Sequence, residues 1–527
     1  MSAASLPTIR VAGALTDALT ADALSQLGTA QLAAFLLQRR WFGGKGRAPV
    51  RVGIGDVVEI RHGDLRAAVV RLDVDTGAEK AVYYQLPLAV RQAGGSEPLA
   101  VLARVEAGAE RGLLFDAVED ESFRVALGSA FVSGATFGGA SARGGTKTAR
   151  WIVEPIATDR SAPVRLAGLP SRTVRAEQSN TSIIFGNAAI LKLFRRMEPG
   201  LNPDVEIGRF LTTRTSFTNT PALLGVIRYE GSDGTDCIAG MLQHFLSGST
   251  DAWQDTLQRS RLYFTRHTQN DATHPFSADA ERIGQVTREL HDALASPSED
   301  AAFVPRRTLR VDVERWAASA RQRIEESIAL LAASVETGGV VNEHGARGVI
   351  EERDSYLHRI DELIAIIGDD AGQMIRHHGD YHLGQVLRTD DGDYQIIDFE
   401  GEPARPLAER RDRNSALRDV AGMLRSFAYA GATLAAEQAG KNNAAEMEQR
   451  AAAWERGARA AFLRGYLGEA TAPFLPSATR AVDAMRELFE TEKVFYELSY
   501  ELNNRPAWAW IPIAGATTLR ATPAGQP

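Results

Sequence analysis

Residues 377–402 concentrate side chains that can carry out chemistry. Asp380 lies in a short polar loop, Gln385 directly precedes an apolar run, and Asp398 directly follows a second apolar run. Carboxylate and amide oxygens are the ligands that hard divalent cations prefer in proteins. The three residues therefore predict a place where a divalent cation and a substrate hydroxyl meet.

A β-hairpin is predicted to bring these residues together. Asp390–Asp393 has the composition of a tight turn and separates two runs rich in apolar residues, Gln385–Arg388 and Tyr394–Ile397. Such a pattern is typical of two antiparallel strands joined by a turn. Folding back places the three polar residues at one end of the hairpin.

The same order of residues resembles the catalytic loop and the metal loop of the protein-kinase-like fold. In that fold an aspartate accepts the hydroxyl proton, an amide residue five positions later holds magnesium, and a second aspartate completes the metal site. The resemblance implies that Asp380 is the catalytic residue and that Gln385 and Asp398 are the metal ligands.

Three other interpretations are consistent with parts of this stretch. His378 and His382 have the spacing of a helical zinc pair, but Gly379 and Gly384 disfavour a helix there. A purely structural hairpin does not require matched polar groups at its ends. A catalytically inactive, kinase-like binding protein would carry the same hairpin, and this alternative stays open.

Composition limits the classes of function. The chain has 527 residues, 44% hydrophobic and 24% charged, which is enough for two or three domains with their own cores. A net charge of −8 gives no support for binding to nucleic acid or to an anionic membrane. Met1–Val11 has no signal-peptide pattern, no apolar run reaches the roughly 20 residues of a membrane span, and Cys237 is the single cysteine. A cytoplasmic protein without disulfides is expected.

The first part of the chain predicts a small cap made of a helix and a sheet, over residues 1–100. Thr16–Arg40 has helical spacing of its apolar residues. Val57–Ile60, Ala67–Val74 and Ala81–Val90 are rich in residues that favour strands.

Residues 101–245 are predicted to form an intermediate and N-lobe subdomain that binds nucleotide. Lys192 lies on an apolar strand, and Glu206 lies near the start of a capped helix, placed to pair with it as in the kinase fold. The polar residues before that strand are predicted to cover phosphates through backbone N–H groups, and the end of a later strand to face adenine. The predicted nucleotide-binding residues are Gln178, Ser179, Asn180, Thr181, Ser182, Lys192, Glu206, Gln243 and Phe245.

Residues 246–527 are predicted to form a mostly helical C-lobe. Helical periodicity is present over Ile283–Leu294, Val311–Ala332, Ile350–Ile367, Arg410–Ala430, Met447–Tyr466 and Ala478–Asn503. A helix that begins near Arg418 and Asp419 is expected to support the metal loop. The predicted fold class is α+β: a bilobal, protein-kinase-like fold with an N-terminal cap, a β-rich N-lobe and a helical C-lobe.

Several motifs together resemble the bacterial maltokinase family. They are Trp-Phe-Gly-Gly-Lys-Gly-Arg at 41–47, Gln-Ser-Asn-Thr-Ser at 178–182, Ile-Leu-Lys-Leu-Phe-Arg-Arg at 190–196, His-Gly-Asp-Tyr-His-Leu-Gly-Gln at 378–385, Asp-Phe-Glu-Gly-Glu-Pro at 398–403 and Glu-Leu-Asn-Asn-Arg-Pro at 501–506. The resemblance covers nearly the whole chain. One departure is Tyr381, where many maltokinases have Leu.

This resemblance implies a reaction. ATP and Mg²⁺ would be the cosubstrate and cofactor, and the γ-phosphate would be transferred to the anomeric hydroxyl of maltose. It also implies a link to trehalose synthase, which would supply maltose by trehalose isomerisation, and a product used for α-glucan (glycogen) synthesis. A related branch acts on glucosamine. The open alternatives are thus an aminosugar kinase of the same fold and a nucleotide-binding pseudokinase that partners an α-glucan enzyme.

The acceptor site is predicted mainly on the last long helix. Three- and four-residue steps place Lys493, Tyr496, Glu497 and Tyr500 on one face, together with Glu501 and Asn504. By spacing alone, this face is equally consistent with sugar binding and with a solvated surface, and the resemblance favours sugar binding. The predicted substrate residues are His382, Glu400, Lys493, Tyr496, Glu497 and Tyr500.

Overall fold

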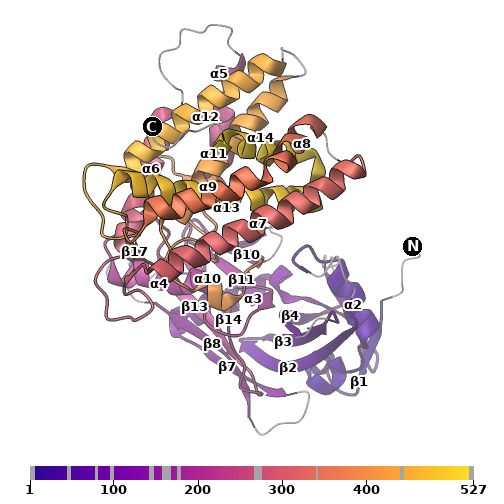
Figure 1. Cartoon of the computed structure of the whole chain (residues 1–527). Helices are drawn as coiled ribbons and strands as arrows, with labels where there is room; N and C mark the ends of the chain where they lie inside the picture. The colour runs from indigo at the N-terminus through magenta and orange to yellow at the C-terminus, as the bar shows by residue number, and fades with distance from the viewer. Residues whose placement is uncertain are drawn as a thin grey trace. The chain divides into compact units, whose positions relative to one another are not determined.

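The computed structural model divides the chain into two compact units. It describes residues 6–43, 49–77, 81–94, 100–141, 147–156, 166, 168–174, 180–265, 276–339, 342–439 and 444–520. Unit 1 comprises Met1–Arg214 and Pro221–Ser247, and unit 2 comprises Thr215–Thr220 and Gly248–Pro527 (Figure 1). The C-lobe was predicted to begin at residue 246. The longer of the two segments of unit 2 begins at Gly248, two positions later.

Unit 1 is built on one continuous sheet of fourteen strands within the described residues. Its order is β1-β5-β6-β4-β3-β2-β7-β8-β13-β14-β11-β10-β9, with β12 paired to β4. The strands are β1 Thr8–Val11, β2 Arg51–His62, β3 Leu65–Asp75, β4 Val82–Gln92, β5 Val101–Ala107, β6 Glu110–Asp116, β7 Thr136–Ser141, β8 Ala149–Pro155, β9 Ser171–Val174, β10 Asn180–Phe185, β11 Ala189–Phe194, β12 Arg196–Met197, β13 Leu223–Glu230 and β14 Asp236–His244. The sheet therefore runs through both the predicted cap and the predicted nucleotide-binding subdomain.

Alternation along the strands gives this sheet two cores. Val58 and Val69 face a core that includes Phe123 of α3, whereas Val57 and Val70 face a second core on the opposite side. Successive side chains of a strand point to opposite faces, so runs of consecutive apolar residues fill both cores. The helices and helical turns of unit 1 are η1 Leu15–Leu19, α1 Ala21–Leu24, α2 Thr29–Leu37, η2 Ala117–Glu119, α3 Glu121–Ser133 and α4 Pro203–Arg214.

Two predicted helices are broken in the structure, and a third, Arg410–Ala430, is continuous only from Leu417. Thr16–Arg40 forms η1, α1 and α2, because Thr20 caps α1 and Gly28 is the N-cap of α2. Ile350–Ile367 is divided into α8 (Glu343–Glu351) and α9 (Arg353–Ile367). The helical spacing of apolar residues continues through these two breaks, so it could not indicate where one helix ends and the next begins.

Unit 2 is mostly helical (Figure 1). Its remaining helices and helical turns are α5 Ala252–Thr265, α6 Ser277–Leu294, α7 Arg310–Glu336, η3 Leu383–Gln385, α10 Leu407–Arg410, α11 Leu417–Ala439, α12 Ala444–Leu467, α13 Thr479–Asn504, η4 Pro506–Trp508 and α14 Trp510–Arg520. Helix α13 packs against α7 through Trp316 and Phe489, whose ring centroids lie 5.1 Å apart, and against α9 through Tyr356 and Phe495 at the same distance. These contacts place α13 inside the helical layer.

The predicted hairpin is confirmed. Strands β18 (Val386–Arg388) and β19 (Tyr394–Ile396) are antiparallel, with Val386 opposite Ile396. Strand β15 (Thr250–Asp251) extends the hairpin to three strands, and β16 (Arg306–Arg307) pairs with β17 (Gln373–Met374) elsewhere in unit 2. Asn219 supports the hairpin, since its carbonyl accepts from the Ile396 N–H at 2.8 Å.

Candidate active site

The loop that carries Asp380 is fixed by a buried carboxylate. Asp419, near the start of α11 and 2% exposed, accepts hydrogen bonds from the backbone N–H of His378 at 2.7 Å and of Gly379 at 2.9 Å. The His291 ring donates to the same carboxylate at 3.0 Å. Burial alone would raise the pKa of Asp419, but the His291 hydrogen bond and the nearby histidine charges outweigh it and hold that pKa well below its usual range. An ionised Asp419 therefore anchors the loop.

The same loop is bonded to the base of the hairpin. The His378 Nε2–H donates to the carbonyl of Ile397 at 2.9 Å, and its Nδ1 accepts from the Asp380 N–H at 3.3 Å. The Ile397 N–H donates in turn to the Gln385 carbonyl at 3.0 Å. These bonds bring the chain at Asp380, at Gln385 and just before Asp398 to one end of the hairpin, as the sequence predicted.

Backbone strain is concentrated at the residue predicted to bind metal. Asp398 has φ +70°, the one positive value among the non-glycine residues that the structure describes. Such a conformation costs on the order of 1–3 kcal/mol and persists where the surroundings enforce it. Close by, Gly379 has φ +86° and a Cβ there would lie 3.2 Å from the Cα of Gly401, so the two segments approach as closely as glycine permits.

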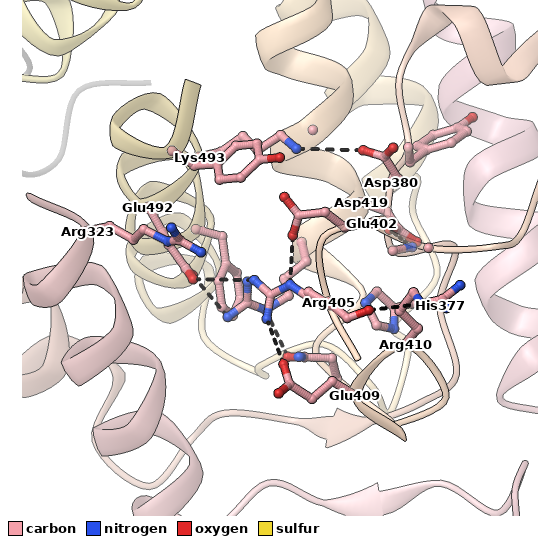
Figure 2. Close-up of a pocket in the computed structure, with 18 residues that line it drawn as sticks. Arg323, His377, Asp380, Glu402, Arg405, Glu409, Arg410, Asp419, Glu492 and Lys493 are labelled. Carbon is pink, nitrogen blue, oxygen red and sulfur yellow. Dashed lines mark hydrogen bonds and ion pairs between the residues drawn. The ribbon is translucent and has the colours of Figure 1, made fainter. Parts of the chain in front are cut away.

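A pocket lies beside Asp380 within unit 2. It is lined by the Asp380 loop, by the segment after Asp398, and by α7, α11 and α13, and it holds about 770 Å³ of empty space including the part open to solvent. Figure 2 shows Lys493 reaching from α13 toward Asp380, with Glu402, Arg405 and Glu492 along the wall.

Each carboxylate that lines this pocket has a basic partner. Asp380 pairs with Lys493 at 3.7 Å, Glu402 with Arg405 at 2.7 Å, Glu409 with Arg405 at 3.7 Å, Glu492 with Arg418 at 2.9 Å, and Asp419 with His291 at 3.0 Å. Burial alone would raise the pKa of Glu402, but Lys493 and Arg405 outweigh it and lower that pKa. The lining holds five carboxylates and five Lys or Arg side chains, so the wall is charged and internally balanced.

The predicted face of α13 is divided between two environments. Lys493 and Tyr496 line the pocket; the Lys493 ammonium lies 4.8 Å from the Tyr496 ring centroid, and the Tyr496 hydroxyl donates to Glu402. Glu497 instead lies in the interior, where its carboxylate pairs with Arg425 at 2.8 Å. Tyr500 is 45% exposed, with its ring stacked on Tyr496 at 6.4 Å.

The two other predicted substrate residues lie near the same loop. The His382 Nδ1 accepts from the Gly384 N–H at 3.0 Å and so caps the turn η3, and burial lowers the pKa of His382. Glu400 is half-buried, and its carbonyl accepts from Arg410 at 3.1 Å.

Unit 1 carries the predicted nucleotide elements. Lys192 lies on β11 and forms an ion pair at 3.2 Å with Asp204, at the start of α4. Glu206, the predicted partner, lies two residues further along α4 and is buried. Asp204 therefore joins Lys192 and Glu206 as a candidate residue that the sequence prediction did not name.

The remaining predicted nucleotide residues lie in or beside strands. Asn180, Thr181 and Ser182 begin β10, where Ser182 pairs with Lys192. The hydroxyl of Thr181 accepts from the buried Arg195 at 2.8 Å. Gln243 lies on β14 and is buried, and the Phe245 N–H donates to the Ala188 carbonyl at 3.0 Å. Gln178 and Ser179 lie outside the described residues.

Comparison with known proteins adds a family to this geometry. The model of the maltokinase N-terminal cap domain matches residues 35–120. A glucosamine kinase from Streptacidiphilus jiangxiensis is 27% identical over 383 residues, covering 72% of this chain and 78% of the relative. A second glucosamine kinase, from Mycolicibacterium smegmatis (strain ATCC 700084 / mc(2)155), is 27% identical over 357 residues, covering 66% and 79%.

Solved structures have the same fold along almost the whole chain. The structure of a glucosamine kinase in complex with glucosamine, ADP and inorganic phosphate matches with a TM-score of 0.62 and 21% identity, covering 93% of this chain and 98% of that one. A glucosamine kinase in another crystal form matches with a TM-score of 0.63 and 21% identity, covering 94% and 99%. At this identity the likeness establishes the fold.

The fold and the comparisons together define a phosphotransferase of the protein-kinase-like superfamily. Residues 35–120 match the maltokinase N-terminal cap domain and the curated relatives are glucosamine kinases, which agrees with the resemblance described from the motifs. The recognition and the fold class predicted from the sequence are thereby confirmed. No helix in the described ranges is long and apolar enough to cross a membrane.

Proposed function

We propose that this protein is an ATP-dependent sugar kinase that phosphorylates maltose at its anomeric hydroxyl. Asp380 would accept a hydrogen bond from the acceptor hydroxyl and orient it toward the γ-phosphate. The supporting geometry is the loop anchored by Asp419, which holds Asp380 at the edge of a pocket lined by charged and aromatic side chains. Phosphoryl transfer depends mostly on positioning and on neutralising charge, so a fixed carboxylate is suited to this role.

Gln385 and Asp398 would hold Mg²⁺, because both offer oxygen ligands at the base of the hairpin. Bound there, the ion would neutralise charge on the phosphates of ATP. Lys192 would bind phosphate, with Asp204 and Glu206 orienting it. Asn180, Thr181, Ser182, Gln243 and Phe245 remain proposed nucleotide residues.

One observation favours a neutral sugar as the acceptor: the five carboxylates that line the pocket are matched by five Lys and Arg side chains in the same lining. An ammonium group taken out of water needs a carboxylate that is not already neutralised. Sugar hydroxyls, in contrast, bind well to planar charged groups, because the Glu402 carboxylate can accept their hydrogen bonds and the Arg405 guanidinium can donate to their oxygens. Lys493 and Tyr496 are the proposed α13 contacts to this sugar.

Glucosamine is the second candidate acceptor. The relatives that share 27% identity over two thirds or more of the chain are glucosamine kinases. In that case, Glu402 or Glu492 would have to exchange its arginine partner for the ammonium group of the aminosugar. The link to trehalose synthase and to α-glucan synthesis is proposed only on the resemblance stated above.

The proposal is tested by turnover of maltose, glucose and glucosamine with ATP and Mg²⁺, measured as ADP release. Maltose should have the highest kcat/KM, and its reducing end should disappear in step with ADP, because phosphorylation of the anomeric hydroxyl blocks it. Asp380→Ala should retain stabilisation by ATP with Mg²⁺ while turnover of every sugar falls by orders of magnitude. A higher kcat/KM for glucosamine, or a reducing end that survives, would refute the assignment to maltose.

A further inference from the structure

Helices α11 and α13 are joined by a row of contacts to three buried glutamates. Each acid lies on α13 and each partner on α11. The contacts are Arg418 to Glu492 at 2.9 Å, Arg425 to Glu497 at 2.8 Å and the Tyr429 hydroxyl to Glu501 at 3.0 Å. Because the residue numbers rise together on both helices, this part of the pair is parallel, and the row fixes both its register and its rotation.

The middle contact is enclosed on several sides. Arg425 is 4% exposed and Glu497 is 9% exposed. A Cβ at Gly515 of α14 would lie 2.7 Å from Nη1 of Arg425, so only glycine leaves room for the guanidinium there. The Tyr429 ring lies 5.9 Å from the same guanidinium. The pair is therefore held in one arrangement.

Helix α11 also fixes the Asp380 loop. Asp419, two turns before Arg425, binds the backbone of His378 and Gly379. The same rigid element thus sets the position of Asp380 on one side and of α13 on the other. On α13, Lys493 lies one turn before Glu497, about 6 Å along the axis.

We propose that Arg425 and Glu497 are positioning residues for the acceptor sugar. They lie outside the set of described residues that line the pocket, and they act through α13 by fixing the rotation that directs Lys493 and Tyr496 at the pocket beside Asp380. This inference rests on the proposed sugar kinase function and changes the role predicted for Glu497, from sugar contact to internal support. A displacement of about 1 Å in a positioning group can cost up to about a hundredfold in rate.

The test removes the ion pair while keeping the interior filled. Replacing a buried pair by apolar residues of similar volume is often neutral for stability, so the double variant Arg425→Met, Glu497→Leu is expected to fold. Its KM for maltose should rise by about tenfold or more, and stabilisation by ATP with Mg²⁺ should be unchanged. Arg425→Lys keeps the charge but loses the guanidinium fork, so it should show a smaller rise in KM.

A matched control exists on the same helix. Arg459 of α12 pairs with Glu490 of α13 at 2.9 Å, and neither is in the pocket lining. The double variant Arg459→Met, Glu490→Leu should leave the KM for maltose within about twofold of the wild type, because this pair joins α13 to α12 and not to α11, the helix that also fixes the Asp380 loop.

Equal changes in the KM for maltose in the two double variants would overturn the inference. If both ion pairs only stabilised the fold, removing either pair would change this KM by the same factor. An unchanged KM in the Arg425 and Glu497 variant would also overturn it. If the wild type turned over none of the tested sugars, the proposed function itself would fail, which is a separate result.

Discussion

Asp419→Asn tests whether the anchored loop sets the rate. The carboxylate accepts three hydrogen bonds, from the N–H groups of His378 and Gly379 and from the His291 ring. The substitution is isosteric, but it replaces one carboxylate oxygen by an NH₂ group. This group donates, and it must face an N–H group that also donates. We therefore expect loss of at least one hydrogen bond and weakening of the others.

The magnitude follows from these contacts. A buried N–H left without a partner costs about 1–3 kcal/mol, and each bond that loses its charged acceptor weakens by about 1 kcal/mol. The sum is about 3–5 kcal/mol, and the Tm should fall by roughly 5–15 °C. Because Asp380 directly follows Gly379, its displacement should lower kcat by about a hundredfold.

The assay pairs thermal unfolding with ADP release, measured at a temperature where the variant is folded. Asp312 provides a matched control, since it is a buried carboxylate of unit 2 that accepts from the Leu309 N–H at 2.9 Å and pairs with Arg306 at 2.8 Å. Asp312→Asn should lose stability without losing kcat. Wild-type kcat in folded Asp419→Asn would refute the reasoning.

Three further outcomes are expected. Asp398→Asn should abolish both turnover and the Mg²⁺-dependent part of thermal stabilisation by ATP, and full activity would contradict its role as a metal ligand. Burial lowers the pKa of His377 to about 4; since the unfolded value is about 6.5, stability should be complete above pH 6.5 and fall by about 3 kcal/mol as pH drops to 4. Urea unfolding across this range should show that slope in the wild type and a flatter one in His377→Asn; identical slopes would exclude His377 as the cause. Tyr496→Phe removes the hydroxyl that donates to Glu402 and should raise the KM for sugar by roughly tenfold while leaving the KM for ATP unchanged, as steady-state kinetics will show.

Local pattern was enough to predict the central hairpin. The strands differ from the predicted Gln385–Arg388 and Tyr394–Ile397 by one residue each, because turn composition and apolar runs act over a few residues. The residue that anchors the Asp380 loop could not be predicted from local pattern. The sequence predicted that the helix near Asp419 supports the metal loop, whereas its recorded bonds go to the loop of Asp380, and that choice depends on a tertiary contact some forty residues away.

Charge pairs were harder to assign than elements. Asp204 and Glu206 both lie in the first turns of α4, and either can face Lys192 by sequence alone. The structure shows an ion pair between Lys192 and Asp204, and the pairing of Lys192 with Glu206 stays a prediction. Glu402 and Arg405 were missed as pocket residues, although Glu402 lies in a motif already singled out, because spacing in a loop does not indicate direction.

Helix geometry explains why the face predicted on α13 did not stay together. At about 100° per residue, Tyr496, Glu497, Tyr500 and Glu501 together cover an arc of about 140° around the helix axis. An arc of that width reaches both the pocket and the neighbouring helix. Accordingly Lys493 and Tyr496 line the pocket, while Glu497 and Glu501 bind Arg425 and Tyr429 in the interior. Three- and four-residue spacing thus identifies which residues of a helix are polar together, and only the neighbours of that helix decide which of them meet a ligand.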